Sequence, residues 1–118
     1  AALPPLLLSS CSTLDSHLYI DDAIEGLIRL CKEPCPDGVY NFGSGDTRPL
    51  RGFVEEMARL TQTSSKLLYG ALPYPATGMV SIWPDVSKLK RELHWEPKVP
   101  FAEGIRTILE SISNGIMI

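Results

Sequence analysis

The sequence predicts an α/β protein of about three short strands and four helices, in which strands and helices alternate before two helices close the chain. Two observations support this prediction. Four segments carry apolar residues at the spacing of an amphipathic helix. Three short runs of β-branched, aromatic and leucine residues lie between turn-forming residues, as strands do. At 118 residues the chain is long enough for a single modest core.

The chain begins with a stretch of no clear pattern. Residues 1–13 show neither helical nor strand periodicity, so we expect an irregular lead-in. A short strand is expected over residues 17–20. The helix after it has Asp21 or Asp22 as its N-cap, and Glu25 follows Asp22 at the spacing of a capping box. The apolar stripe of this helix consists of Ile24, Leu27, Ile28 and Cys31.

The middle of the chain predicts a strand, a helix and a further strand. Residues 39–42 follow a turn at residues 36–38 and have the composition of a strand. A second helix begins near Pro49, and its buried face consists of Leu50, Phe53, Val54, Met57 and Leu60. Residues 66–69 predict the third strand. Residues 70–84 form a long loop, and loops of this length are usually functional or disordered.

The last part of the chain predicts two helices. Asp85 caps the first of them, which ends before Trp95. Its inward residues are Val86, Leu89 and Leu93. The last helix starts near Phe101 and stops around residues 114–115, with Ile105, Ile108, Leu109 and Ile112 at helical spacing. We therefore divide the chain into the lead-in 1–13, one domain over 14–113 and a tail over 114–118.

Composition and charge argue against several classes of protein. Hydrophobic residues at 44% and charged residues at 21% are ordinary for a folded soluble chain. A net charge of -3 gives no electrostatic footprint for nucleic acid. No apolar run approaches the roughly 20 residues of a membrane span, and the Leu3–Leu8 run is a poor signal peptide. Three cysteines without metal-binding spacing suit a reducing compartment, so we expect a cytoplasmic protein without a metal site.

Three local features each have a structural and a functional interpretation. Gly43-x-Gly45 is placed like a dinucleotide-binding loop, but Arg48 stands where the third glycine belongs, which favours a plain turn. Asp21 and Asp22 are better explained by helix capping than by acid/base chemistry. The basic residues near the third helix indicate a solvated helix face; they are Lys88, Lys90, Arg91 and Lys98. The two histidines, His17 and His94, are isolated in the sequence, which gives little support to a metal site.

Several sequence motifs occur in the order found in a known family. They are Asp15-Ser-His17 before Tyr19-Ile-Asp-Asp22, then Tyr40-Asn-Phe-Gly-Ser-Gly45, Pro75-Ala-Thr-Gly78, Pro84-Asp-Val-Ser-Lys88 and Leu93-His-Trp-Glu-Pro97. From about Leu14 to Ser111 the chain resembles the C-terminal, substrate-binding part of the extended short-chain dehydrogenase/reductase family. Members of this family are the NAD-dependent epimerases and dehydratases of nucleotide sugars.

The resemblance implies a part of an enzyme whose Rossmann cofactor domain is absent from this sequence. Family members oxidise the sugar transiently by hydride transfer to NAD or NADP, and they use a Tyr-x-x-x-Lys pair as acid/base. Four residues after Tyr19, Tyr40, Tyr69 and Tyr74 stand Ala23, Ser44, Pro73 and Gly78, none of which is lysine. We therefore expect no catalytic and no cofactor-binding residue in this chain, and NAD or NADP only in a full-length family member.

The resemblance also implies a site for a nucleotide sugar. Two arginines of the family hold its diphosphate, but Asp15 and Pro75 occupy their positions here. The substrate-binding residues that we predict are Tyr40, Asn41, Tyr74 and Trp83. The predicted function is the substrate-binding portion of an epimerase or dehydratase that is not catalytic by itself. The alternative is a diverged, non-catalytic binding or interaction module. The predicted partners are a nucleotide sugar and either the missing Rossmann domain or a second copy of the chain.

Overall fold

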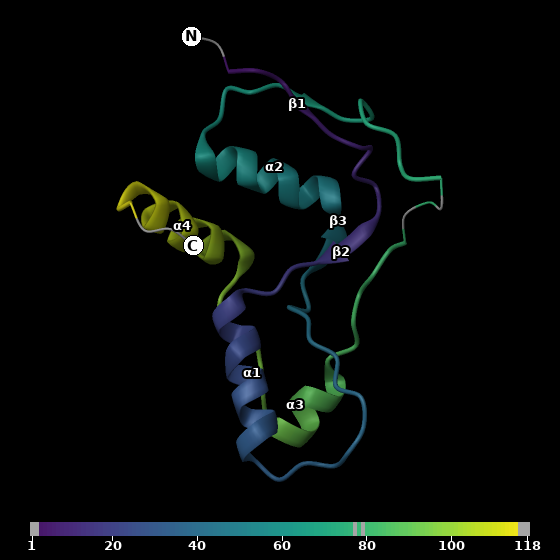
Figure 1. Cartoon of the computed structure of the whole chain (residues 1–118), viewed down its shortest axis with the longest axis vertical. Helices are drawn as coiled ribbons and strands as arrows, with labels where there is room; N and C mark the ends of the chain where they lie inside the picture. Colours follow the sequence, from purple (N-terminus) through teal and green to yellow (C-terminus); the bar gives the residue numbers. More distant parts are fainter. Residues whose placement is uncertain (1–2, 77, 79, 116–118) are drawn as a thin grey trace. The chain divides into compact units, whose positions relative to one another are not determined.

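The structure is a computed structural model that describes residues 3–76, 78 and 80–115 (Figure 1). The described part contains four helices and four short strands, in keeping with the predicted α/β class. The chain groups into two compact units. We call them unit 1, formed by Ala1–Asp15 and Arg48–Ile82, and unit 2, formed by Ser16–Thr47 and Trp83–Ile118.

Unit 1 combines one helix with a two-stranded parallel sheet. Strand β1 (Leu6–Leu7) pairs with β4 (Leu67–Leu68), and Leu6 lies opposite Leu67. Helix α2 (Leu50–Thr61) buries Phe53 completely, whereas Met57, predicted on the buried face, is exposed. The predicted second helix and third strand are therefore confirmed, the strand in a shorter form. The expected irregular lead-in is partly wrong because β1 lies within it, and this pairing joins segments distant in sequence that local periodicity does not reveal.

Two of the predicted strands are not formed as expected. Strand β2 (Leu14–Ser16) ends before the strand predicted over 17–20, and it pairs with β3 (Thr47–Pro49), which the sequence did not predict. Residues 39–42 form no strand, and Val39 is 79% exposed. A strand needs a hydrogen-bonding neighbour, and within the described residues no strand pairs with 39–42.

Unit 2 contains three helices and a small apolar core. The helices are α1 (Ile20–Lys32), α3 (Ser87–Leu93) and α4 (Phe101–Ser113), each at a place where the sequence predicts a helix. Helices α1 and α3 lie side by side (Figure 1). The core consists of Val86, Leu89, Leu93 and Trp95, and the partly buried Leu18, Leu30, Cys35, Tyr40 and Phe42 pack against it. The inward face predicted for α3 is confirmed.

The helix caps differ from the predicted ones. The N-cap of α1 is Tyr19, so the prediction of Asp21 or Asp22 is wrong. Asp22 lies inside the first turn, and its carboxylate accepts hydrogen bonds from another segment instead of capping the helix. The N-cap of α3 is Val86 by backbone geometry, but the residue before it does the capping. Asp85 Oδ1 accepts a 2.9 Å bond from the Ser87 backbone N–H, and this bond lowers the pKa of Asp85.

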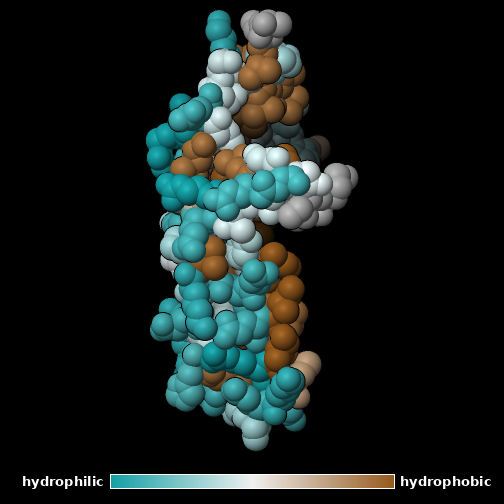
Figure 2. All heavy atoms as spheres, turned by 90° about the vertical axis from the view of Figure 1, so that its left-hand side faces the viewer, coloured by the Kyte–Doolittle hydropathy of each residue, from teal (hydrophilic) through white to brown (hydrophobic). Residues whose placement is uncertain are grey.

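The apolar stripe predicted for α1 is not buried. Ile24, Leu27 and Ile28 are between 46 and 53% exposed, and Cys31 is exposed as well. Figure 2 shows hydrophobic atoms gathered in a column at the height at which Figure 1 draws α1. The helix instead turns Asp22 and Gly26 inward. Periodicity finds the stripe but does not show whether a neighbouring element covers it.

Candidate functional site

The start of α1 and the segment after α3 meet in a buried junction. Trp95 is fully buried, and its indole Nε1 donates a 2.9 Å hydrogen bond to the backbone carbonyl of Asp22. The Asp22 carboxylate, also buried, accepts bonds from the backbone N–H groups of Lys98 at 3.1 Å and Val99 at 3.0 Å. These bonds offset the cost of burying a charged group. The junction therefore joins the Tyr-x-x-Asp motif to the Leu-x-Trp-x-Pro motif.

Gly26 allows two aromatic side chains to approach α1 closely. A Cβ atom at this position would overlap Phe42 Cε1 and would lie 3.0 Å from Trp95 Nε1. The Phe42 and Trp95 rings meet edge to face, with their centroids 5.6 Å apart. Any larger residue at position 26 would push these rings away, so the glycine is part of the junction.

A charged network closes the outer side of the junction. Arg29 donates hydrogen bonds to the backbone carbonyls of Leu93 at 3.0 Å and His94 at 3.1 Å, where α3 ends. Arg29 and Lys98 also bond the Glu25 carboxylate, at 2.9 and 3.3 Å. The hydrogen bond from Lys98, followed by that from Arg29, lowers the pKa of Glu25. These charges hold segments together, which leaves Glu25 ionised and poorly suited to donate a proton.

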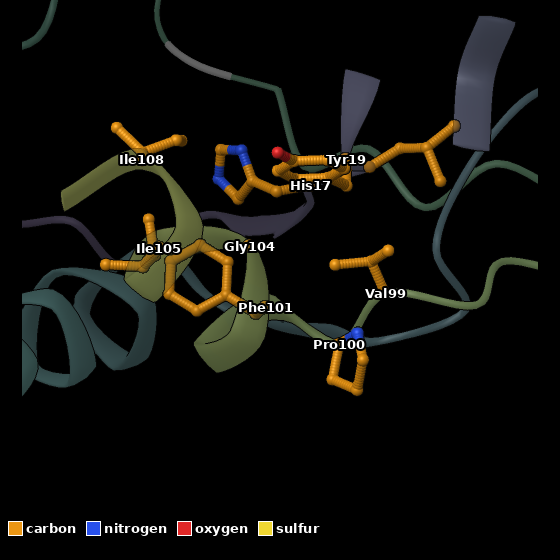
Figure 3. Close-up of a pocket in the computed structure, with 9 residues that line it drawn as sticks. His17, Tyr19, Val99, Pro100, Phe101, Gly104, Ile105 and Ile108 are labelled. Atoms are coloured by element: carbon orange, nitrogen blue, oxygen red, sulfur yellow. The ribbon is translucent and has the colours of Figure 1, made fainter. Parts of the chain in front are cut away.

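A small apolar hollow lies beside the junction, between α4 and the residues that precede α1. It has a volume of about 170 Å³ and is lined by His17, Leu18, Tyr19, Val99, Pro100, Phe101, Gly104, Ile105 and Ile108. Figure 3 shows Phe101, Ile105 and Ile108 projecting from α4 toward His17. The His17 and Phe101 ring centroids are 6.1 Å apart. Tyr19 packs so closely on α4 that a Cβ at Gly104 would lie 2.7 Å from its ring.

A second hollow of about 260 Å³ shares four lining residues with the first and is more polar. Ser44, Asp46, Pro97 and Lys98 complete its wall. Ligand pockets for drug-sized molecules are typically about 300–1,000 Å³. The volume of each of these two hollows lies below that range.

Three of the four predicted substrate-binding residues lie in unit 2, outside both hollows. The Tyr40 hydroxyl donates to the carbonyl of Pro36, and Lys88 Nζ lies 4.3 Å from the centroid of its ring. Burial, with Cys35 as a neighbour, raises the pKa of Tyr40 to about 12, so its phenol stays protonated at neutral pH. Asn41 is exposed, and Trp83 is 60% exposed. Trp83 therefore presents an accessible ring face.

The fourth predicted residue, Tyr74, lies in unit 1 among serine hydroxyls. Its phenol oxygen accepts a 2.7 Å bond from Ser10 Oγ and a 3.1 Å bond from the Ser12 backbone N–H. Ser12 Oγ is also 3.1 Å away. These hydrogen bonds, that from the Ser10 hydroxyl first, lower the pKa of Tyr74 to about 8 because they stabilise the phenolate.

The arginines of unit 1 are held in ion pairs with glutamates of α2. Arg48 is paired with Glu56 at 2.6 Å and stacks on Phe53, and Arg51 is paired with Glu55 at 2.9 Å. Arg51 also lies 4.0 Å from the centroid of the Tyr69 ring. Both guanidinium groups are thus paired with carboxylates of the same unit. Their contacts are those of a structural role.

The residues around Gly43-Ser-Gly45 do not fit a dinucleotide. No helix begins after this turn, since β3 (Thr47–Pro49) lies between it and α2, and the phosphate-binding helix N-terminus is therefore missing. A Cβ at Gly43 would lie 2.7 Å from Pro84, so this glycine serves packing. Among the described residues no group of three His, Cys, Asp or Glu side chains is arranged to hold a metal ion. None of the helices in the described ranges has the length and apolarity to cross a membrane.

Sequence reasoning missed two structural elements of the site. The contact between Tyr19 and Gly104 joins distant segments, and the only signal for it is a glycine inside a helical pattern. The role of Asp22 was also missed because the capping box offered a local explanation. A carboxylate followed by an apolar helix looks the same in sequence whether it caps the helix or receives another segment.

Several characterised proteins are similar to most of this chain, although no protein-family model matches it. UDP-N-acetyl-alpha-D-glucosaminuronate decarboxylase of Bacillus cytotoxicus is 26% identical over 96 residues, which are 78% of this chain and 30% of that protein. UDP-glucuronate 4-epimerase of Thermodesulfobacterium geofontis is 32% identical over 89 residues, covering 75% of this chain and 27% of that protein. The chain thus spans about a third or less of the length of these relatives.

Solved structures show the same fold. RMD from Pseudomonas aeruginosa, complexed with NADPH, superposes with a TM-score of 0.78 at 19% identity, over 95% of this chain and 37% of that chain. UDP-glucose 4-epimerase of Thermotoga maritima, with UDP-glucose, gives a TM-score of 0.80 at 22% identity, over 94% and 35%. Together with the curated relatives, they place this chain in the extended short-chain dehydrogenase/reductase family, among the NAD-dependent nucleotide-sugar epimerases and dehydratases, of which it represents a part.

Proposed function

We propose that residues 14–113 are the nucleotide-sugar-binding portion of an NAD(P)-dependent epimerase or dehydratase and are not catalytic by themselves. The observation that carries this proposal is the buried junction of Asp22 with Trp95, Lys98 and Val99. It connects two sequence motifs shared with the family, so the framework that positions the family's substrate site is retained. In this account NAD or NADP and the catalytic Tyr-x-x-x-Lys pair are supplied by a cofactor domain outside these 118 residues.

The chemistry of the chain's own residues favours binding over catalysis. The sequence contains no lysine four residues after a tyrosine. Tyr40 has a pKa of about 12 and therefore keeps its proton at neutral pH, whereas the hydrogen bonds from Lys98 and Arg29 lower the pKa of Glu25 and keep it ionised. Neither group has a pKa near neutrality, where an acid/base catalyst works best. Tyr74 has a pKa of about 8, but no lysine stands four residues after it. We expect no hydride transfer from a sugar nucleotide to NAD or NADP by residues 1–118, and measurable turnover in that assay would refute this part of the proposal.

Substrate binding rests on Trp83, Tyr40, Asn41 and Tyr74. The exposed Trp83 ring offers a stacking surface for a base or sugar, and such contacts contribute about 1–3 kcal/mol per base in other systems. The acidic Asp15 at a phosphate-binding arginine position opposes a diphosphate. We therefore expect weak binding that strengthens when this charge is removed.

Calorimetric titration tests the site directly. UDP-glucose and UDP-glucuronate are added to the intact chain and to the variants Asp15→Arg and Trp83→Ala. The proposal expects tighter binding by Asp15→Arg and weaker binding by Trp83→Ala, while the matched exposed control Ile112→Ala stays unchanged. Absence of heat from all four proteins at millimolar nucleotide would exclude a sugar-nucleotide site.

A second candidate function is a diverged, non-catalytic interaction module on the same scaffold. The observation that favours it is the replacement of both phosphate-binding arginines, by Asp15 and Pro75, beside an intact junction. The coding region upstream distinguishes the two candidates. A glycine-rich βαβ start and a Tyr-x-x-x-Lys there would support the enzyme, and an unrelated upstream sequence would support the module.

The segment 39–42 fits a role in docking the cofactor domain. It lies without a paired strand in the described part of the chain, and Val39 is largely exposed. We propose that a strand of the cofactor domain pairs with it, which would reduce hydrogen exchange of its amides in a longer protein.

We also propose a cytoplasmic location, because Cys11, Cys31 and Cys35 are free. Recovery of the tagged protein in a secreted fraction would contradict that location.

A further inference from the structure

The long loop that follows β4 is attached at both ends to the segment that follows β1. Near its start, the backbone N–H of Gly70 donates a 3.0 Å hydrogen bond to the carbonyl of Ser9. Near its far end, the Ile82 N–H donates a 3.0 Å bond to the carbonyl of Leu14. These residues all belong to unit 1. The loop is therefore held along residues 9–14, and its backbone bonds are part of the fold.

The segment that holds the loop is itself fixed to the start of α2. The carbonyl of Cys11 accepts a 2.8 Å hydrogen bond from the Arg51 N–H, and that of Thr13 accepts a 2.9 Å bond from the Leu50 N–H. The first N–H groups of a helix have no partner within the helix, so these carbonyls supply what α2 lacks. Cys11 is also buried. Residues 11–13 are thus a firm base for the loop.

Between the two ends of the loop, the Tyr74 side chain makes the attachment. A phenol hydroxyl has one proton to donate and two lone pairs that accept. The Ser10 hydroxyl, at 2.7 Å, and the Ser12 N–H, at 3.1 Å, occupy the lone pairs, and Ser12 Oγ lies 3.1 Å away, where it can accept the proton. The two serine hydroxyls are 3.1 Å apart as well. We call these three residues the hydroxyl clamp; its internal bonds use the full capacity of the phenol.

The anchoring residues stand directly before the two positions that the family resemblance assigns to the diphosphate. Tyr74 precedes Pro75, and Leu14 precedes Asp15. Both pairs lie in unit 1. The hydroxyl clamp and the bond between Ile82 and Leu14 therefore hold the two segments that carry positions 15 and 75.

We propose that Tyr74 supports nucleotide-sugar binding as a positioning residue: its hydroxyl, held by Ser10 and Ser12, keeps the loop in place and does not touch the ligand. This inference rests on the proposed function, since it specifies the part that Tyr74 has in that site. Loss of the phenol hydroxyl frees position 75 from position 15 and weakens binding without removing a ligand contact. The ring of Tyr74 is half-buried, so Tyr74→Phe keeps its packing and removes only the hydroxyl.

Amide hydrogen exchange of the intact chain tests the clamp without any ligand. In Tyr74→Phe the Ser12 N–H loses its acceptor, so its exchange is expected to accelerate by about threefold or more. The Leu50 N–H, bonded to Thr13 on the other side of the same segment, is the internal control and keeps its rate. Unchanged exchange at Ser12 overturns the proposal, and so does equal acceleration at both amides, which would show general unfolding.

Calorimetric titration with UDP-glucose then separates positioning from direct contact. Ser10→Ala and Tyr74→Phe are each expected to weaken binding by about threefold to tenfold, because each removes hydrogen bonds of the clamp. Ser10→Thr keeps the hydroxyl and should restore the affinity. The matched control is Ser64→Ala, at an exposed serine of unit 1 outside the clamp, which leaves the affinity unchanged.

The double variant Ser10→Ala/Tyr74→Phe gives the decisive comparison. Both changes act through one set of bonds, so the double variant should bind no more weakly than Tyr74→Phe alone. Losses that multiply would show that Tyr74 touches the ligand itself, and unchanged affinity in Tyr74→Phe would show that the clamp has no part in binding. Either result overturns the positioning role while the proposed function stands. Absence of binding by the unmodified chain would instead refute the proposed function, and this inference with it.

Discussion

Trp95 donates its indole hydrogen bond to the backbone carbonyl of Asp22, at 2.9 Å, in the interior of unit 2. The side-chain carboxylate of the same aspartate accepts hydrogen bonds from the backbone N–H groups of Lys98 and Val99. Asp22 of the Tyr-x-x-Asp motif thus binds the Leu-x-Trp-x-Pro motif and the residues just after it through both its backbone carbonyl and its carboxylate. The most recognisable residues of the sequence are therefore a structural joint, and they do not themselves form a ligand site.

The first prediction concerns the indole hydrogen bond. Trp95→Phe removes the donor and leaves the Asp22 carbonyl buried without it, which should lower the free energy of unfolding by about 1–3 kcal/mol. Trp83→Phe changes an exposed ring and should stay within about 0.5 kcal/mol. Urea denaturation of both variants measures the difference. Equal stability of the two would show that the bond contributes nothing.

The second prediction concerns the Asp22 carboxylate. Asp22→Ala leaves the backbone N–H groups of Lys98 and Val99 without their acceptor, and we expect a loss of about 2–3 kcal/mol in unfolding free energy. Asp21→Ala removes an exposed carboxylate from the same turn and should cost less than about 1 kcal/mol. If the two substitutions cost the same in denaturant titration, Asp22 acts only through the helix dipole.

The third prediction concerns the close approach at Gly26. Gly26→Ala forces its Cβ into Phe42 and toward Trp95, so overpacking should destabilise the fold by about 1–3 kcal/mol despite alanine's higher helix propensity. Gly52→Ala in α2 meets only the flexible Arg48 side chain at 3.4 Å and should be neutral or stabilising by up to about 1 kcal/mol. The thermal unfolding temperature should fall for Gly26→Ala and stay unchanged or rise for Gly52→Ala, and an equal fall for both variants would disprove the steric account.

The fourth prediction concerns the titration of Tyr74. Its pKa of about 8 lies below the ordinary value of 10.0, because Ser10 and Ser12 donate to the phenolate. Unfolding therefore takes up a proton between these two pH values, so stability contributed by Tyr74 is present above about pH 10 and is lost as pH falls through about 8. Phenolate absorbance should show this step and lose it in Tyr74→Phe. Ser10→Ala should move the step upward, and an unmoved step would exclude the serine as its cause.

The sequence could predict the four helices of the described residues because each carries its apolar spacing within one segment. It could not predict β1 or β3, since two- and three-residue strands are defined by distant partners. Asp22 illustrates the same limit at the site. Its local pattern indicated a cap, but the groups that bond it lie more than 70 positions later. The ligand positions remain predictions, because the structure places Tyr74 in unit 1 and Tyr40, Asn41 and Trp83 in unit 2.

Nuclear magnetic resonance of the two tryptophan side chains tests the central claim most directly. The chain contains two tryptophans, one exposed at position 83 and one buried in the junction. During titration with UDP-glucose, the account predicts a saturable shift of the Trp83 indole signal while the Trp95 signal stays in place. Movement of neither signal at millimolar UDP-glucose, or of Trp95 alone, would contradict a nucleotide-sugar-binding role for this chain.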